Sequence, residues 1–206
     1  MTVRLRLAHT ADLDPAELAE IRALLDVAFG GDFSDEDWDH GLGGLHVLIR
    51  DGFGLAAHGS VVMRRLRHAG RWLRTGYVEA VAVRADARRT GLGGRVMAEL
   101  ERVIERAYDL GALSAGAAGA PLYTARGWRR WEGRVCALSP KDGIVRLPEE
   151  EGSLYVRPCP DPADEVRPCP DPADEVRPCP DPADNVRPCL DPADALVLDW
   201  RDGDVA

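Results

Sequence analysis

Apolar and polar residues alternate over residues 3–8, which is the period-two pattern of a half-buried β-strand. Residues 14–17 (Asp-Pro-Ala-Glu) then have the composition of a capping box, with a proline suited to the first helical position. Apolar residues follow at helical spacing up to about Phe29, where two glycines end the pattern. A second capped helix is predicted over residues 34–41.

Three strands are predicted next, over residues 45–50, 54–68 and 72–83. The connections between them contain Asp-Gly and Ala-Gly pairs, which favour tight turns. The end of the third strand, residues 77–83, is rich in β-branched and small residues. We therefore expect it at the centre of the sheet.

A long amphipathic helix is predicted from Leu92 to about Leu110, because its apolar residues recur on one face. The remaining predicted elements are a strand at 112–116, a helix at 121–126, a strand at 128–138 and a last strand at 195–200. This order is not a strict alternation of strands and helices, so it disfavours a doubly wound fold. It predicts an α/β (α+β) fold with a mixed central sheet flanked by helices in a single domain.

A ten-residue tandem repeat separates the last two predicted strands. VRPCPDPADE at residues 156–165 recurs three times, with small changes, up to residue 195. Each unit has two or three prolines and little to bury, so we expect an extended or disordered insertion. The predicted domain is therefore residues 1–155 plus 195–206, with residues 156–195 as the insertion.

Composition narrows the class of protein. Apolar residues make up 45% of the chain and charged residues 30%, as in ordinary globular domains. The net charge is −9, of which the repeats contribute −6, so no basic surface for nucleic acid or an anionic membrane is predicted. There is no apolar run of membrane-spanning length and no secretory pattern at the N-terminus. We expect a cytoplasmic enzyme.

Cysteine and histidine spacing favours neither a disulfide framework nor a metal site. Four of the five cysteines occupy the same position of the repeat, and Cys136 stands alone. The histidines lack metal-ligand spacing and are interpreted as structural or surface residues. They are His9, His40, His46, His58 and His68.

The most informative stretch is YVEAVAVRADARRTGLGG, residues 77–94. A buried strand leads into a loop with two arginines and three glycines, and the loop leads into a helix. Backbone N–H groups of such a loop, together with a helix N-terminus, suit a phosphate. The spacing excludes GxxxxGK[ST] and GxGxxG, and it fits [Q/R]xxGx[G/A] from Arg88 to Gly93. A plain left-handed turn before a helix is the alternative.

This loop resembles the pyrophosphate loop of the GNAT acetyltransferases, and Tyr123 followed by Gly127-Trp128 resembles a second GNAT motif. Further segments resemble the aminoglycoside 2′-N-acetyltransferases, and together they extend the resemblance over residues 3–155 and 195–205. These segments are 31–33, 37–38, 42–44, 76–79, 81–86, 110–114 and 199–205.

The resemblance implies an acetyl-CoA-dependent N-acetyltransferase that modifies the 2′-amine of aminoglycosides in a ternary complex and so confers antibiotic resistance. It assigns acetyl-CoA binding to Val81, Ala82, Val83, Arg88, Arg89, Thr90, Gly91, Leu92, Gly93 and Gly94. Backbone N–H groups around Val81 and Val83 would hold the thioester and its oxyanion. Glu79 would accept the amine proton through water, and Tyr123 would protonate the CoA sulfur.

Aminoglycosides are polycations, so their pocket should carry carboxylates. The resemblance places Asp32, Asp37, Glu79, Ser114, Glu150 and Asp204 near the substrate. Taken alone, Asp32, Asp37 and Glu150 are more simply explained as solvated charges or helix caps, and Tyr123 could be a core aromatic. Glu79 lies within an apolar strand, where an unpaired charge is costly, which favours a role in a site.

Two other hypotheses stay open. The chain could be a GNAT enzyme for another small amine, a cell-wall precursor or a protein amine. It could also be a non-catalytic acyl-CoA-binding protein whose repeats mediate an interaction. A homodimer is implied by the resemblance, with apolar and aromatic residues around Trp128 and Trp131 as support from the sequence. The chain ends in Ala206, where the resembled family often has an aromatic residue.

Overall fold

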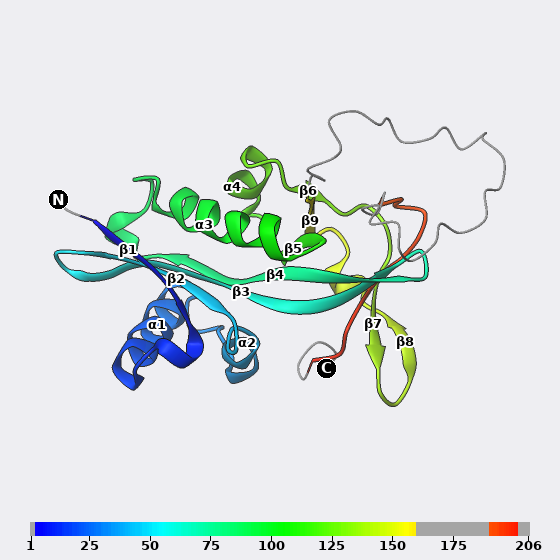
Figure 1. Ribbon diagram of the computed structural model, residues 1–206, viewed down its shortest axis with the longest axis horizontal. Helices are drawn as coiled ribbons and strands as arrows, with labels where there is room; N and C mark the ends of the chain where they lie inside the picture. Colours follow the sequence, from blue (N-terminus) through cyan, green and yellow to red (C-terminus); the bar gives the residue numbers. More distant parts are fainter. Residues whose placement is uncertain (1–2, 160–189, 202–206) are drawn as a thin grey trace.

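The structure, a computed structural model, describes residues 3–159 and 190–201. In this part of the chain, strands form one mixed sheet and helices pack on it (Figure 1). The strands are β1 (Arg4–His9), β2 (Leu45–Asp51), β3 (Gly54–His68), β4 (Arg71–Val83), β5 (Leu110–Ser114), β6 (Arg129–Arg130), β7 (Val135–Ser139), β8 (Gly143–Arg146), β9 (Leu154–Pro158) and β10 (Leu196–Leu198). The α-helices are α1 (Pro15–Ala28), α2 (Asp35–His40), α3 (Leu92–Ala107) and α4 (Ala120–Ala125).

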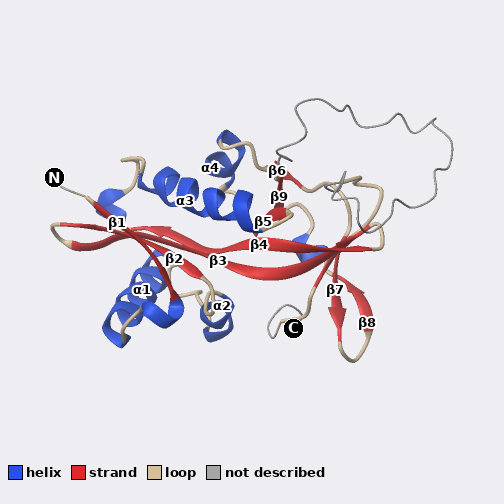
Figure 2. Ribbon diagram, in the orientation of Figure 1, coloured by secondary structure: helices blue, strands red, loops and turns tan. Residues whose placement is uncertain are grey.

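The molecule has three layers. In Figure 2, α3 and α4 cover one face of the sheet, and α1 and α2 cover the other. The β7–β8 hairpin projects to the same side as α1 and α2. The described residues thus form the predicted single α+β domain, with a mixed sheet flanked by helices.

The long β3–β4 hairpin organises the sheet, whose main strand order is β6-β9-β5-β4-β3-β10-β7-β8. β3 pairs with β2 along its first part and with β10 near its end, both antiparallel. β4 pairs with β3 on one side and runs parallel to β5 on the other. β4 is thus a central strand, as predicted, although of residues 77–83 only Tyr77 pairs with both neighbouring strands.

The helices form where capping and periodicity predicted them. Asp14 and Glu17 make the reciprocal hydrogen bonds of a capping box at the start of α1. The apolar stripe of α3 is buried against β2, β3 and β4. Its fully buried residues are Val96, Met97, Leu100 and Ile104, and each stabilises the fold by roughly 1.5–3 kcal/mol.

Several predicted bounds were wrong. α3 ends at Ala107, before the predicted Leu110, because Asp109 is already bound to β4: its N–H donates to the Arg74 carbonyl, and its carboxylate accepts from the Arg74 N–H. β5 therefore begins at Leu110. The strand predicted at 128–138 is two strands, β6 and β7, which belong to different parts of the sheet.

β8 and β9 were not predicted from the sequence. β9 lies between β5 and β6 and extends into the first repeat unit, so the core continues past residue 155 to Pro158. The predicted extended or disordered state of the repeats concerns mainly residues 160–189, which lie outside the described residues.

Candidate active site

A cavity of about 840 Å³ opens where β4 and β5 separate. The two parallel strands pair from Thr75 to Tyr77 on β4 and from Leu110 to Ala112 on β5. Beyond this point both strands line the cavity. The connection between α1 and α2 and the 3-10 turn Pro148–Glu150 contribute further residues to its wall.

Most of the predicted site residues line this cavity. They are Asp32, Asp37, Glu79, Val81, Ala82, Val83, Arg88, Ser114, Tyr123 and Glu150. The other predicted loop residues, which lie outside the cavity lining, are Arg89, Thr90, Gly91, Leu92, Gly93 and Gly94. They continue from Arg88 into the start of α3. Asp204 lies outside the described residues.

A bulge distorts β4 next to Glu79. Ser60 on β3 pairs with Glu79, whereas His58 pairs with Ala82, so β4 has one extra residue in this stretch. Ala80 within the bulge has a φ of 50°, a left-handed conformation that costs an L-residue roughly 1–2 kcal/mol. The Ser60 hydroxyl donates to the Glu79 carbonyl at 3.3 Å. The backbone is thus distorted where it lines the cavity.

The glycine-rich loop has the geometry of an anion site. Gly91 is the N-cap of α3 with a φ of 86°, and it offers no side-chain capping bond to the first N–H groups of the helix. Arg89 is also left-handed, with a φ of 61°. The Thr90 hydroxyl donates to the Ala87 carbonyl at 2.6 Å and Arg88 Nε to the Val83 carbonyl at 3.2 Å. These bonds fix the loop beside the N-terminus of α3, where a phosphate is favoured.

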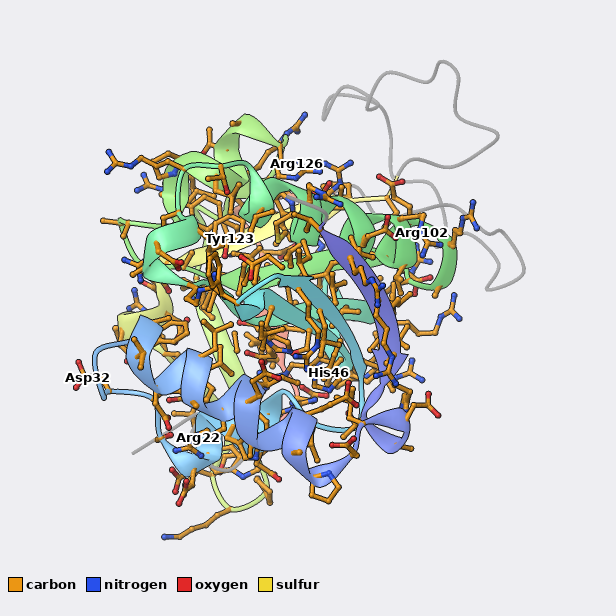
Figure 3. The ribbon with its side chains drawn as sticks, turned by 90° about the vertical axis from the view of Figure 1, so that its left-hand side faces the viewer. Arg22, Asp32, His46, Arg102, Tyr123 and Arg126 are labelled. Atoms are coloured by element: carbon orange, nitrogen blue, oxygen red, sulfur yellow. The ribbon has the colours of Figure 1, made fainter. Side chains whose placement is uncertain are left out.

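Tyr123 projects from α4 into the cavity wall (Figure 3). Its ring packs against Trp128 and Tyr155, with centroid distances of 6.4 and 6.1 Å. Burial raises the pKa of Tyr123 to about 12. The hydroxyl is therefore protonated at neutral pH, as a proton donor must be.

A chain of hydrogen bonds joins three elements along one wall. Tyr77 Oη lies 3.0 Å from Ser114 Oγ, and Ser114 Oγ donates to Glu150 Oε2 at 2.6 Å. Glu150 also accepts from the Ser153 hydroxyl at 3.0 Å. Because the Ser114 hydroxyl donates its hydrogen to Glu150, its oxygen accepts from the Tyr77 hydroxyl. Burial raises the pKa of Tyr77 well above its ordinary value, so the Tyr77 hydroxyl is protonated and can donate. The sequence analysis named Ser114 and Glu150 but missed Tyr77, although Tyr77 lies two positions before Glu79 on the same strand.

The predicted carboxylates differ in their surroundings. Asp37 closes the capping box of α2, because its carboxylate accepts from the Ser34 N–H at 2.9 Å, and it lines the cavity as well. Asp32 lies in the connection after α1, where its side chain points away from the ribbon in Figure 3. Asp37 thus caps α2 and also lines the cavity, and Asp32 lies at the rim.

Arg64 is a cavity residue that the sequence analysis missed. Its side chain is 2% exposed, with the guanidinium carbon 5.0 Å from the centre of the Tyr77 ring. Arg64 Nε donates to Asp199 Oδ1 at 2.8 Å, and the Arg65 N–H donates to Asp199 Oδ2 at 2.8 Å. Asp199 is 135 positions away in the sequence, so no local pattern could have indicated this pair.

The described residues were also compared with the requirements of a metal site and of a membrane-spanning helix. Within residues 3–159 and 190–201, no cluster of three or more His, Cys, Asp or Glu side chains could hold a metal ion. Over the same ranges, no helix is both long and apolar enough to span a membrane.

A family profile matches more than half of the chain. The profile described as "Acetyltransferase (GNAT) domain" matches residues 10–131. This range contains β4, the glycine-rich loop, α3 and Tyr123. It therefore includes both motifs on which the predicted acetyl-CoA site depends.

A curated relative and several solved structures extend this similarity. An aminoglycoside 2′-N-acetyltransferase of Mycolicibacterium fortuitum is 42% identical over 200 residues, which cover 97% of this chain and 90% of the relative. The GNAT-family N-acetyltransferase YhbS of Escherichia coli, solved in complex with CoA, has a TM-score of 0.55 at 20% identity and covers 77% of this chain and 82% of its own. ElaA of Escherichia coli has a TM-score of 0.53 at 17% identity, covering 76% and 99%. These two structures show a shared fold.

Proposed function

The chain belongs to the aminoglycoside 2′-N-acetyltransferase family within the GNAT acetyltransferases, and from this premise we propose that it transfers the acetyl group of acetyl-CoA to the 2′-amine of aminoglycosides. The observation that carries the proposal is the cavity between β4 and β5. Its wall combines the carboxylates of Asp37, Glu79 and Glu150 with the Ser114 hydroxyl, close to the bulge of β4. Carboxylates around a cavity of this size suit a polycationic sugar.

The residues of the glycine-rich loop fit the pyrophosphate of acetyl-CoA. The N-cap Gly91 leaves the first N–H groups of α3 without a side-chain acceptor, and a phosphate oxygen is the acceptor that a helix N-terminus favours. Arg88 and Arg89 are exposed and can add charged donors. With its pyrophosphate at this loop, acetyl-CoA would extend its thioester end along the cavity, which Arg88 and Val83 line, to the bulge of β4.

The proposed reaction is one direct transfer. The neutral 2′-amine attacks the thioester carbonyl carbon, and the backbone N–H groups of Val81 and Val83 stabilise the oxyanion. Glu79 accepts the amine proton through a water molecule, an amide bond forms, and the C–S bond breaks. The departing sulfur takes a proton from Tyr123, Glu79 releases its proton to solvent, and Tyr123, whose pKa is about 12, regains a proton from solvent. Each proton therefore has a stated donor and acceptor.

We also propose a cytoplasmic homodimer that confers aminoglycoside resistance. Apolar surface for a dimer is available on β3, β4, β7 and β8, where large apolar side chains are exposed. They are Met63, Trp72, Leu138 and Ile144, which are 40–52% exposed. Trp128 and Trp131 cannot contribute to this surface, because they are 2% and 3% exposed. Sedimentation velocity over a concentration series would test the dimer.

The proposed substrate is tested by following free CoA thiol with tobramycin, which has a 2′-amine, and with kanamycin A, which has a 2′-hydroxyl. We expect turnover with tobramycin and none with kanamycin A. Equal turnover of both would place the reaction at another amine. Binding of acetyl-CoA without turnover of either would point to one of the other hypotheses, a different amine or a non-catalytic role.

A further inference from the structure

Two buried histidines, which the proposed mechanism does not use, contact each other beneath the bulge of β4. His46 on β2 and His58 on β3 are each 1% exposed. His46 Nδ1 lies 3.0 Å from His58 Nε2, and His58 Nδ1 lies 3.3 Å from the carbonyl oxygen of Ala80. At the other end, His46 Nε2 lies 2.8 Å from the Thr10 hydroxyl. In Figure 3, His46 lies among the strands in the interior of the molecule.

The Ala80 carbonyl at the end of this chain of hydrogen bonds determines which atom donates in each of them. A carbonyl only accepts, so His58 Nδ1 must carry a proton and donate to Ala80. A neutral His58 then has an acceptor at Nε2, which requires a proton on His46 Nδ1. The Nε2 atom of His46 then carries no proton and accepts from the Thr10 hydroxyl at 2.8 Å, which is shorter than the 3.3 Å from this hydroxyl to its other acceptor, the Gly44 carbonyl. The hydroxyl oxygen accepts from the Gly43 N–H at 2.9 Å. Four hydrogen bonds therefore run in one direction, from Gly43 to Ala80.

Both imidazoles are neutral, as this assignment requires. Burial lowers the pKa of His58 to about 3 and that of His46 to about 4. A secondary contribution to each comes from the neighbouring histidine, His46 for His58 and His9 for His46. Neither ring gains a proton in the pH range of an enzyme assay, so the direction of the chain does not change there.

This chain of hydrogen bonds ends at the Ala80–Val81 peptide, which joins the two residues of the bulge that do not pair with β3. Because a trans peptide is planar, the N–H of Val81 points opposite to the carbonyl of Ala80. His58 Nδ1 holds that carbonyl, so the N–H of Val81 points away from the His58 ring, and Val81 itself lines the cavity. Ala80 keeps its left-handed φ of 50° in this arrangement.

We propose that His58, oriented by His46 and Thr10, is a positioning residue that directs the Val81 N–H at the thioester carbonyl of acetyl-CoA. This inference rests on the proposed acetyl transfer and adds the means by which its oxyanion donor is aimed. His58 contacts neither substrate in this account. It acts through the Ala80–Val81 peptide, whose rotation would turn the donor away.

Two substitutions of His58 test its hydrogen bonds to Ala80 and to His46 separately. The side-chain nitrogen of asparagine can take the position of Nδ1 in histidine as a donor, and the side-chain oxygen of glutamine can take the position of Nε2 as an acceptor. His58→Asn therefore keeps the bond to Ala80 and loses the bond to His46, whereas His58→Gln does the reverse. Removal of one oxyanion donor lowers kcat by about 10²–10³-fold, so a misdirected donor should lower kcat by about tenfold or more in His58→Gln and His58→Leu. We expect His58→Asn to stay within about threefold of wild type, with similar KM values for the amine throughout.

His68 supplies the matched control. It is also a buried histidine of β3, 3% exposed, and its Nε2 lies 2.9 Å from the Asp191 carbonyl, away from the cavity lining. We expect His68→Gln to lower the thermal midpoint without changing kcat per folded molecule. Near-UV circular dichroism and the thermal midpoint of each variant would give the folded fraction.

A second readout does not depend on the amine. Infrared difference spectra of bound acetyl-CoA with a ¹³C-labelled acetyl carbonyl report the hydrogen bond to that carbonyl directly. We expect the low-frequency shift of the stretch in wild type and His58→Asn, and a smaller shift in His58→Gln and His58→Leu.

The outcomes distinguish this inference from the proposed function. If tobramycin is not acetylated but the carbonyl shift follows the predicted series, the substrate is wrong and the positioning role stands. If the wild type acetylates tobramycin while His58→Gln and His58→Asn lose kcat equally, or while the shift is the same in all variants, His58 is a structural residue and the inference is overturned.

Discussion

Tyr123 is the residue on which the proposed protonation of the CoA sulfur depends. Burial against Trp128 and Tyr155 raises its pKa to about 12. A raised pKa favours the protonated form, so the hydroxyl remains a donor from pH 6 to pH 9 and ionises only as the pH rises through about 12. Over the range of an assay, therefore, no loss of activity at high pH should come from Tyr123.

Replacement of Tyr123 by phenylalanine removes that donor and keeps the ring. We expect kcat to fall by about 10²-fold or more with little change in either KM, since general acid catalysis contributes 10²–10⁴-fold. Steady-state kinetics between pH 6 and pH 9 would measure this. An unchanged kcat would show that the thiolate leaves without help from Tyr123, and that the ring is a core aromatic. The thermal midpoint of the variant is the control for folding.

At the scale of elements, periodicity predicted the parts that are long and regular. α1, β3 and β4 repeat one pattern over many residues, and their predicted and observed bounds agree to within a residue or two. β9 could not be found this way, because it has five residues and its last three belong to the proline-rich repeat. Those residues are ordered by pairing with β5 and β6, which the local sequence does not encode.

The candidate site likewise has a part that a local motif predicts and a part that depends on contacts between distant elements. The loop from Arg88 to Gly94 is a local motif, so its spacing and its place between a strand and a helix could be predicted from the sequence. The Tyr77–Ser114–Glu150 chain and the contact between His58 and Ala80 join residues from different elements. Such contacts depend on sheet register, and a buried histidine has no pattern in the sequence that distinguishes it from a surface one.

Glu101 connects α3 to α4 and thereby holds the element that carries Tyr123. It is 6% exposed and accepts from Arg126 Nε at 2.8 Å and from Trp128 Nε1 at 2.9 Å. In Figure 3, Arg126 lies in the layer of helices above the sheet. Because α4 has six residues, its own hydrogen bonds contribute little, and its position depends on such contacts.

Substitution of Glu101 by alanine should therefore affect stability and catalysis together. It removes the carboxylate acceptor of Trp128 Nε1 and of the Arg126 guanidinium, for which we expect a loss of about 3 kcal/mol in the free energy of unfolding. Urea unfolding would measure it. We also expect kcat to fall, because Tyr123 is less well placed. Glu99→Ala, at an exposed ion pair on the same helix, is the control and should change stability by less than about 1 kcal/mol. Equal effects of the two substitutions would contradict the connection.

At the scale of the whole molecule, segments that flank the repeats are part of the catalytic domain. β9 ends inside the first repeat unit and pairs with β5, while β10 follows the repeats and pairs with β3 and β7. Asp199, just after β10, binds Arg64 in the cavity wall, and Arg201 donates to the His40 carbonyl at 2.8 Å. The two flanks thus reach the cavity from the β5 side and from the β3 side.

The domain should therefore tolerate a change in repeat number that keeps both flanks. Deletion of residues 166–185 removes two complete units and leaves the first and last. Each cavity-lining residue that the structure describes lies between Ala28 and Glu150, so we expect kcat and KM for tobramycin to stay within about twofold of the full chain. A control chain that replaces the same twenty residues by a Gly/Ser sequence separates length from composition. A fall of about tenfold in kcat/KM in the deletion chain alone would show that β10 needs the full number of residues between it and β9 to reach its place in the sheet. The same loss in both chains would show that the repeats themselves contribute to activity, as the interaction hypothesis requires.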